Sequence, residues 1–143
     1  MRISTKGRYS LIALLYMALL EKGVYASTRE IASKTAISEG YLEQLFIPLR
    51  KSGIIQGVRG SQGGYYIERP LNEISVGSIL RSVEGTLAPT ECVDSKHCPS
   101  EASCLSRHTW KSLYKGIIDC VNAISLQDLV AYYNTDKDPE YAI

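Results

Sequence analysis

The first fifty residues carry apolar side chains three or four positions apart, which is the spacing of helices with one buried face. A first helix is predicted to begin at a cap within residues 4–5 and to end near Lys22, just before Gly23. Its apolar side is formed by Ile12, Leu15 and Leu19, so we expect these three side chains to face the core.

Two shorter helices are predicted to follow. The Ser27-Thr28-Arg29-Glu30 segment has the pattern of a capping box and opens a helix that ends near Thr35. After a two-residue connection, Ser38 caps a third helix that reaches about Gly53, and Pro48 should kink this helix or tighten its last turn. The side expected to be buried consists of Leu42, Leu45, Phe46 and Leu49.

The pattern then changes to period two, which is typical of strands. Residues 54–58 and 65–67 are predicted to pair as a hairpin around a glycine-rich turn at 60–64. Three short helices followed by a hairpin describe a winged helix-turn-helix. The predicted fold class is therefore mostly α with one small β-hairpin.

The remaining residues predict a short helix, a loop and a long helix. Ser75 caps the short helix, which ends at Gly85, and residues 86–104 form a loop with two prolines and three cysteines. The long helix spans about 105–124. Its apolar side chains are spaced 4, 3, 4 and 3 residues apart, as in a coiled coil, and they predict a homodimer seam. This seam is formed by Trp110, Tyr114, Ile117, Val121 and Ile124.

Three regions are therefore expected: a winged-helix region at 1–85, a cysteine loop at 86–104, and a dimerisation helix with a tail at 105–143. Their charges differ, although the net charge of the chain is only +1. Residues 1–70 hold ten Lys and Arg against five acidic residues, whereas residues 71–143 hold six against ten. A basic half joined to an acidic half favours a nucleic-acid-binding module fused to a second function.

The third helix has side chains suited to reading DNA bases in the major groove. Gln44 can pair with adenine, Glu43 can accept from cytosine, and Ser38 and Tyr41 can reach bases or phosphates. Arg59 on the hairpin is placed to enter a narrow minor groove. The candidate DNA contacts are Arg2, Ser38, Gly40, Tyr41, Glu43, Gln44, Arg59 and Gly60. The alternative is a small domain that binds another protein and whose polar side chains are merely solvated.

Three cysteines of the loop, Cys92, Cys98 and Cys104, are each separated by five residues. Thiols stay reduced in the cytosol, so convergent thiolates favour a soft metal or an iron–sulfur cluster over disulfides. The spacing matches neither the Cys-x2-Cys of structural zinc nor the tighter ferredoxin spacing. An iron–sulfur cluster, a zinc ion and redox or structural thiols all remain open on chemistry alone. The fourth cysteine, Cys120, is expected to be a buried, inert thiol of the long helix.

Several segments resemble the IscR-type iron–sulfur regulators, a superfamily that also includes NsrR-type and CymR-type proteins. They are the first nine residues, the Ser38-Glu39-Gly40-Tyr41-Leu42-Glu43-Gln44-Leu45 run, and the Val58-Arg59-Gly60-Ser61-Gln62-Gly63-Gly64-Tyr65 run. The resemblance covers nearly the whole chain. It implies a homodimer that binds palindromic operators in double-stranded DNA.

The resemblance also implies that Cys92, Cys98 and Cys104 hold an iron–sulfur cluster, with 2Fe-2S favoured. CymR-type members lack these cysteines. IscR-type proteins have His at the position of Arg107, and an arginine side chain stays protonated and cannot ligate. His108, one residue further, is the favoured fourth ligand because imidazole suits iron. Glu43 is the second candidate for this position.

The expected function is thus a cluster-dependent transcription regulator, either a repressor or a dual regulator, that senses cluster supply, iron, redox state or nitric oxide. A cluster-independent regulator of cysteine metabolism is the alternative, and a small redox carrier is a third reading. No catalytic Ser/His/Asp or Cys/His set is present, so we do not expect an enzyme. The longest apolar run, Leu11–Leu20, is too short for the roughly 18–20 residues that span a bilayer. The N-terminal residues lack a cleavage signal, so a soluble, cytoplasmic protein is expected.

Overall fold

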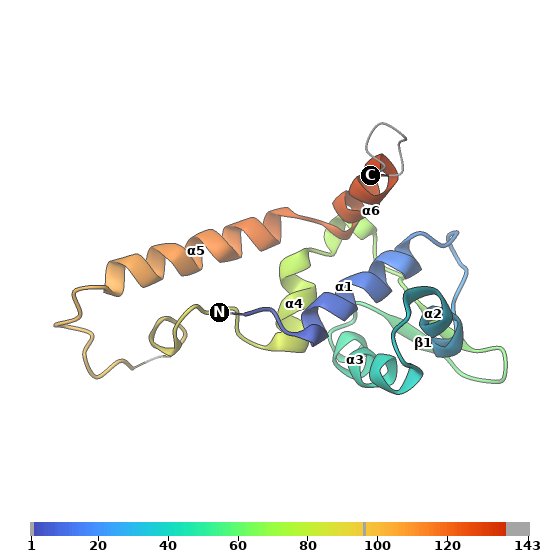
Figure 1. Ribbon diagram of the computed structural model, residues 1–143, viewed down its shortest axis with the longest axis horizontal. Coiled ribbons are helices and arrows are strands. Elements are labelled where there is room, and N and C mark those ends of the chain that lie inside the picture. The colour runs from blue at the N-terminus through green and yellow to red at the C-terminus, as the bar shows by residue number, and fades with distance from the viewer. Residues whose placement is uncertain (1, 96, 137–143) are drawn as a thin grey trace.

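The computed structural model describes residues 2–95 and 97–136. Six α-helices, one two-stranded sheet and two short 3-10 helices lie within these residues (Figure 1). Their bounds are α1 Thr5–Ala18, α2 Thr28–Thr35, α3 Glu39–Lys51, β1 Gln56–Val58, β2 Gly64–Tyr66, η1 Leu71–Glu73, α4 Val76–Glu84, η2 Glu91–Val93, α5 Arg107–Ala123 and α6 Leu126–Asp136. The mostly helical winged-helix prediction is therefore confirmed. Residues 137–143 of the expected tail lie outside the described residues.

Serine side chains cap the first four α-helices. The hydroxyls of Ser4, Ser27, Ser38 and Ser75 each accept a hydrogen bond from a backbone N–H of the first turn. The donor–acceptor distances lie between 3.0 and 3.3 Å. Each bond satisfies an N–H that has no partner inside its helix, which is why these helices begin where the sequence predicts.

The turn between α2 and α3 is tight because Ala36 adopts a left-handed conformation, with φ of 58°. This conformation ends α2 and lets α3 begin three residues later. The apolar side of α3 is buried as predicted, and it packs against α1, α2 and α4 in the main core. Its buried side chains are Leu42, Leu45, Phe46 and Leu49.

The predicted hairpin is present, but its first strand is shorter than expected. Ile54 and Ile55 are both fully buried instead of alternating, and their N–H groups donate to the carbonyl of Leu49. They therefore close α3, and only Gln56–Val58 pair with Gly64–Tyr66. On its other edge, Tyr65 exchanges two backbone hydrogen bonds with Ala26, of 2.8 and 3.0 Å. The hairpin is thereby fixed to the start of α2.

The first helix differs from its prediction in length and in its buried face. It ends at Ala18 rather than near Lys22, and its buried side chains include Ala13, Leu14 and Met17. Ile12 is 44% exposed and Leu19 is 37% exposed, so the predicted side was wrong for these two residues. A run of apolar residues fits more than one helical face, and packing against α4 and α6 selected the face one position away.

The last helices are joined to the body through α4. The Val76 N–H donates to the carbonyl of Ile124, and the Leu126 N–H donates to that of Ile74, both at 2.8 Å. From this junction α5 extends away from the winged-helix body, and the cysteine loop runs along it back to α4 (Figure 1). Four of the five predicted seam residues pack against a small cluster of the same chain, formed by Val76, Leu80 and Leu87, yet no residue of α5 is buried.

Candidate functional site: a DNA-reading surface and a cysteine pocket

The predicted recognition helix presents an exposed polar face. Gly40, Glu43 and Gln44 are exposed on α3, and so is Ser38 at its cap. Gln44 lies at a hollow that is also lined by Lys6 of α1. An exposed amide beside a cation is an arrangement that would suit a helix in the major groove, where amides can pair with bases and cations with phosphates.

Tyr41 and Ser38 have structural partners as well. The ring of Tyr41 is half-buried and meets the ring of Tyr9 edge-on, with centroids 5.7 Å apart. The hydroxyl of Ser38 accepts from the Tyr41 N–H at 3.3 Å. Both residues therefore help to position α3. Arg2 is exposed just before α1.

A second basic feature lies between α2 and the hairpin. Arg59 and Gly60 are exposed on the hairpin and line a groove that also contains Arg29 and Arg50. Ser27, the cap of α2, completes this groove. Three guanidinium groups around one groove suit a DNA phosphate. Sequence reasoning used Arg29 only as part of a capping box and did not name it as a candidate DNA contact, because the groove forms only when the hairpin folds against α2.

The three loop cysteines line one pocket at the start of α5, together with Val93, Ser95, Glu101, Arg107 and Lys111. All of the cysteines are free thiols, and Cys92 is exposed. The backbone between them turns twice: the Glu101 N–H donates to the carbonyl of Cys98 and the Ser103 N–H donates to that of Ser100, both at 3.1 Å. The loop thus brings together residues that are twelve positions apart in sequence.

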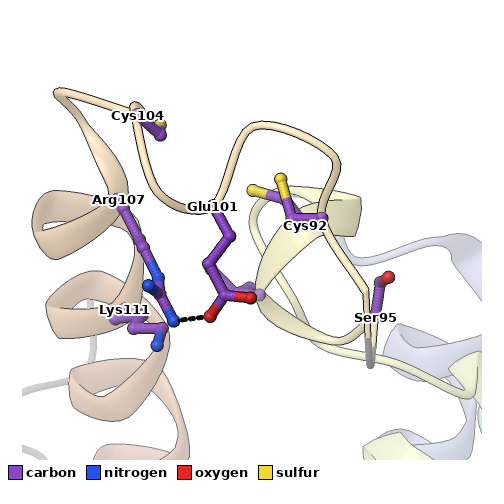
Figure 2. A pocket seen from close by; sticks show the side chains of 8 residues that line it. Cys92, Ser95, Glu101, Cys104, Arg107 and Lys111 are labelled. Carbon is purple, nitrogen blue, oxygen red and sulfur yellow. Dashed lines mark hydrogen bonds and ion pairs between the residues drawn. The ribbon is translucent and has the colours of Figure 1, made fainter.

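The pocket also contains an ion pair. Figure 2 shows Glu101 between Cys92 and Cys104, with its carboxylate paired to the guanidinium of Arg107. Lys111, one turn further along α5, adds a second cation. These groups give a pocket of three thiols and mixed charge, which favours an anionic or metal-containing ligand over an apolar one.

Neither predicted fourth ligand lines this pocket. His108 is exposed on the first turn of α5, and it is the preceding residue, Arg107, that faces the cysteines. Glu43 is exposed on α3, which contributes no residue to the pocket. Which residue completes the cysteine set stays a proposal.

Cys104 has an environment that favours its thiolate. A hydrogen bond from the hydroxyl of Ser106 lowers the pKa of the Cys104 thiol, with a smaller contribution from the charge of Arg107. The indole N–H of Trp110 donates to the same hydroxyl oxygen at 3.0 Å. This bond leaves the Ser106 proton free to point at the sulfur. Trp110, expected only to pack, therefore helps to orient a thiol partner.

The three cysteines line one pocket, but their sulfur atoms are not arranged as the ligands of one metal ion. Among residues 2–95 and 97–136, no three His, Cys, Asp or Glu side chains lie close enough together to hold one metal ion. Binding would require the loop to draw its thiols inward. The donor chemistry fits an iron–sulfur cluster, since thiolates are its usual ligands and three of them share one pocket.

Cys120 lies apart from this site. It is exposed on α5, so the expectation of a buried thiol was wrong for the single chain. Ile117 and Val121 of this helix pack toward α4, whereas Cys120 takes no part in that packing. Across the same described part of the chain, no helix is long and apolar enough to cross a membrane.

The fold, the exposed recognition helix and the basic groove define a winged-helix transcription regulator with a cysteine loop. The family model "Iron-dependent Transcriptional regulator", Rrf2, matches residues 3–132. The chain therefore belongs to the Rrf2 family. Its relatives are named as transcriptional regulators, and the chain is not an enzyme.

Relatives of two types are similar to this chain. The HTH-type transcriptional regulator IscR of Pectobacterium carotovorum is 38% identical over 130 residues, which cover 91% of this chain and 79% of that protein. The structure of T. potens IscR has a TM-score of 0.77 at 31% identity and covers 96% of this chain and 91% of that one. The structure of CymR, the global cysteine regulator of B. subtilis, has a TM-score of 0.75 at 33% identity, covering 92% and 98%. The fold alone does not separate the two types.

Proposed function

We propose that this chain is an iron–sulfur-cluster-dependent transcription regulator of the IscR type, acting in the cytoplasm as a repressor or dual regulator. Cys92, Cys98 and Cys104 would hold the cluster, which we take to be 2Fe-2S. The observation that carries this proposal is that all three cysteines line one pocket, beside an ion pair and a second cation. When bound, such a cluster supplies a redox-active centre whose loss or oxidation can serve as a signal.

The partner proposed is a palindromic operator in double-stranded DNA, bound by a homodimer. Gln44 and Glu43 would read base edges, and the groove around Arg29, Arg50 and Arg59 would hold phosphates. A second copy of the chain would cover α5, where Leu113 is 46% exposed and no residue is buried. Replacing the exposed Leu113 by Glu should give a monomer in sedimentation at micromolar concentration.

The link between pocket and DNA surface would run through α4. This helix contacts α1, α3 and α5, and its last residue leads directly into the cysteine loop. Drawing the thiols inward would act on the end of the element against which the recognition helix packs. Packed helices would thus connect the pocket to the face of α3 that we propose reads bases.

The test is anaerobic purification, followed by visible spectroscopy, iron and sulfide analysis, and titration of the bacterium's own promoter fragments with loaded and stripped protein. Replacing all three pocket cysteines by Ser should abolish iron and sulfide. Cys120→Ser is the matched control, because this thiol lies outside the pocket, and it should leave both unchanged. Wild-type protein that takes up neither iron nor sulfide yet binds operator normally would favour the alternative, a cluster-independent regulator of cysteine metabolism of the CymR type.

A further inference from the structure

The cysteine pocket contains one carboxylate, that of Glu101. The other polar side chains of its lining are less suitable as iron ligands. Arg107 and Lys111 carry protonated donors without a free lone pair at neutral pH. The Ser95 hydroxyl donates to the carbonyl of His97 at 2.8 Å and is uncharged. Glu101 is thus the anionic oxygen donor that the fold places with the three thiols.

The position of Glu101 in the chain gives a ligand spacing that also occurs in iron–sulfur proteins. It lies midway between two of the cysteines, in the order Cys98-x2-Glu101-x2-Cys104. Ligands separated by two residues occur in ferredoxin loops, twice in succession in the bacterial type and once in the plant type, so this spacing lets a short loop bring successive side chains to one cluster. A turn already draws the first pair together, since the Glu101 N–H donates to the carbonyl of Cys98 at 3.1 Å. The three cysteines alone lack this tight spacing.

The ion pair with Arg107 is compatible with a ligand role. A carboxylate has two oxygens, so one can bind iron while the other keeps the guanidinium. Arg107 is 39% exposed and Glu101 is 50% exposed, so the pair can rearrange without breaking a packed core. A retained Arg107, with Lys111 beside it, would offset the negative charge of a thiolate-bound cluster.

His108 is less well placed. Successive residues of a helix point about 100° apart, and Arg107 is the residue that faces the pocket from the first turn of α5. The side chain of His108 is therefore turned to one side of that direction, and it is exposed and does not line the pocket. Moving it into the pocket would require the first turn of α5 to unwind.

We propose that Glu101 is the fourth protein ligand of the cluster, next to Cys92, Cys98 and Cys104. This inference rests on the cluster-dependent function proposed above. A carboxylate oxygen is a harder ligand than a thiolate, so the bond between Glu101 and iron would be the weakest of the four bonds that hold the cluster. Cluster loss should then begin at Glu101, and Arg107 is already in place to take up the released carboxylate.

The experiment compares five full-length proteins that are loaded anaerobically with ferrous iron and sulfide: wild type, Glu101→Gln, Glu101→Cys, His108→Ala and Glu91→Gln. Glu91 is the matched control, because it is an exposed acid of the same loop that does not line the cysteine pocket. The readouts are iron and sulfide per chain, the visible circular dichroism spectrum, and the rate at which a chelator removes the iron. Far-ultraviolet spectra check that each variant is folded.

Glu101→Gln should shift the visible bands and speed iron removal by at least about tenfold, since even the loss of a residue that only supports a metal ligand costs roughly 10- to 100-fold in metal affinity. Glu101→Cys should keep the iron content and slow its removal, because it creates a four-thiolate set. His108→Ala and Glu91→Gln should behave as wild type. A wild-type spectrum and removal rate in Glu101→Gln, or changes confined to His108→Ala, would overturn this assignment alone. A wild-type protein that binds no iron and sulfide would overturn the cluster proposal and this inference with it.

Discussion

The hydroxyl of Ser4 donates to the carboxylate of Glu84 across 2.7 Å and so joins the start of α1 to the end of α4. The same carboxylate oxygen accepts from the N–H groups of Ser4 and Gly7, at 2.9 and 3.0 Å. It therefore caps α1 from another helix and meets the positive end of that helix dipole. A side chain at Gly7 would place its Cβ 2.6 Å from this oxygen, so only glycine leaves room for the contact.

Replacing Glu84 by Gln should lower the free energy of unfolding by about 1–2 kcal/mol, because a charged cap becomes a neutral one. Urea denaturation followed by circular dichroism measures this change. Glu68→Gln is the control, since that acid is exposed and should have no effect beyond about 0.5 kcal/mol. Equal unfolding midpoints for the two variants would show that the interhelical cap contributes little.

Gly77 lies where α4 and α5 approach each other closely. A Cβ at this position would lie 2.2 Å from the side-chain oxygen of Asn122 and 3.0 Å from a methyl group of Val121. Gly77→Ala should push the two helices apart and lower stability by about 1–3 kcal/mol. Gly40→Ala, with open space around its Cβ, should leave stability unchanged or raise it by up to about 1 kcal/mol. Thermal denaturation of both variants distinguishes crowding from a general effect of alanine.

Gln44 and the arginines of the hairpin groove should affect DNA binding in different ways. Gln44→Ala should relax discrimination at one base pair by about 1–3 kcal/mol, because its amide is exposed where a base edge can be read. Arg59→Ala and Arg29→Ala should weaken binding to all sequences alike and lower the salt dependence by about one phosphate contact each. Operator and scrambled duplexes titrated at several salt concentrations give both quantities. Unchanged discrimination in Gln44→Ala would contradict the base-reading role.

The elements that sequence predicted well are those fixed by local chemistry. The serine caps of α2, α3 and α4 each define a helix start through one hydrogen bond to a neighbouring N–H, so the residues alone indicate it. The buried side of α3 followed from spacing, since Leu42, Leu45 and Leu49 recur three or four residues apart, whereas Ile47 lies off this face and is exposed.

The wrong predictions concern residues whose positions are decided by tertiary packing. The face of α1 with Ile12 was predicted to be buried because an almost continuous apolar run has no unique buried side. Ile54 was read as a strand residue, although it folds back on α3. Glu101 was missed because an acid in a polar loop resembles any solvated carboxylate until the loop places it beside three thiols. Only its spacing from Cys98 and Cys104 could have indicated it.

The thiol of Cys104 should ionise at a lower pH than an ordinary cysteine. Its pKa is lowered from the usual 9.0 mainly by the Ser106 hydroxyl, so its reaction with iodoacetamide should reach half-maximum below that pH. Ser106→Ala removes this hydrogen bond and should move the profile upward. The measurement uses metal-free protein in which Cys92, Cys98 and Cys120 are replaced by Ser. A profile that does not change in Ser106→Ala would exclude this hydrogen bond as the cause.

The long helix α5 has no buried residue in a single chain, and Leu113 remains 46% exposed. In the homodimer proposed above, a second copy binds only the folded chain. The free energy of unfolding would therefore increase with protein concentration, by mass action. The melting temperature should therefore rise as protein is concentrated, and it should stop doing so in Leu113→Glu, which places a charge on the exposed side of the helix. In a cell that makes few copies, the amount of protein itself would then set how much folded, operator-competent regulator exists.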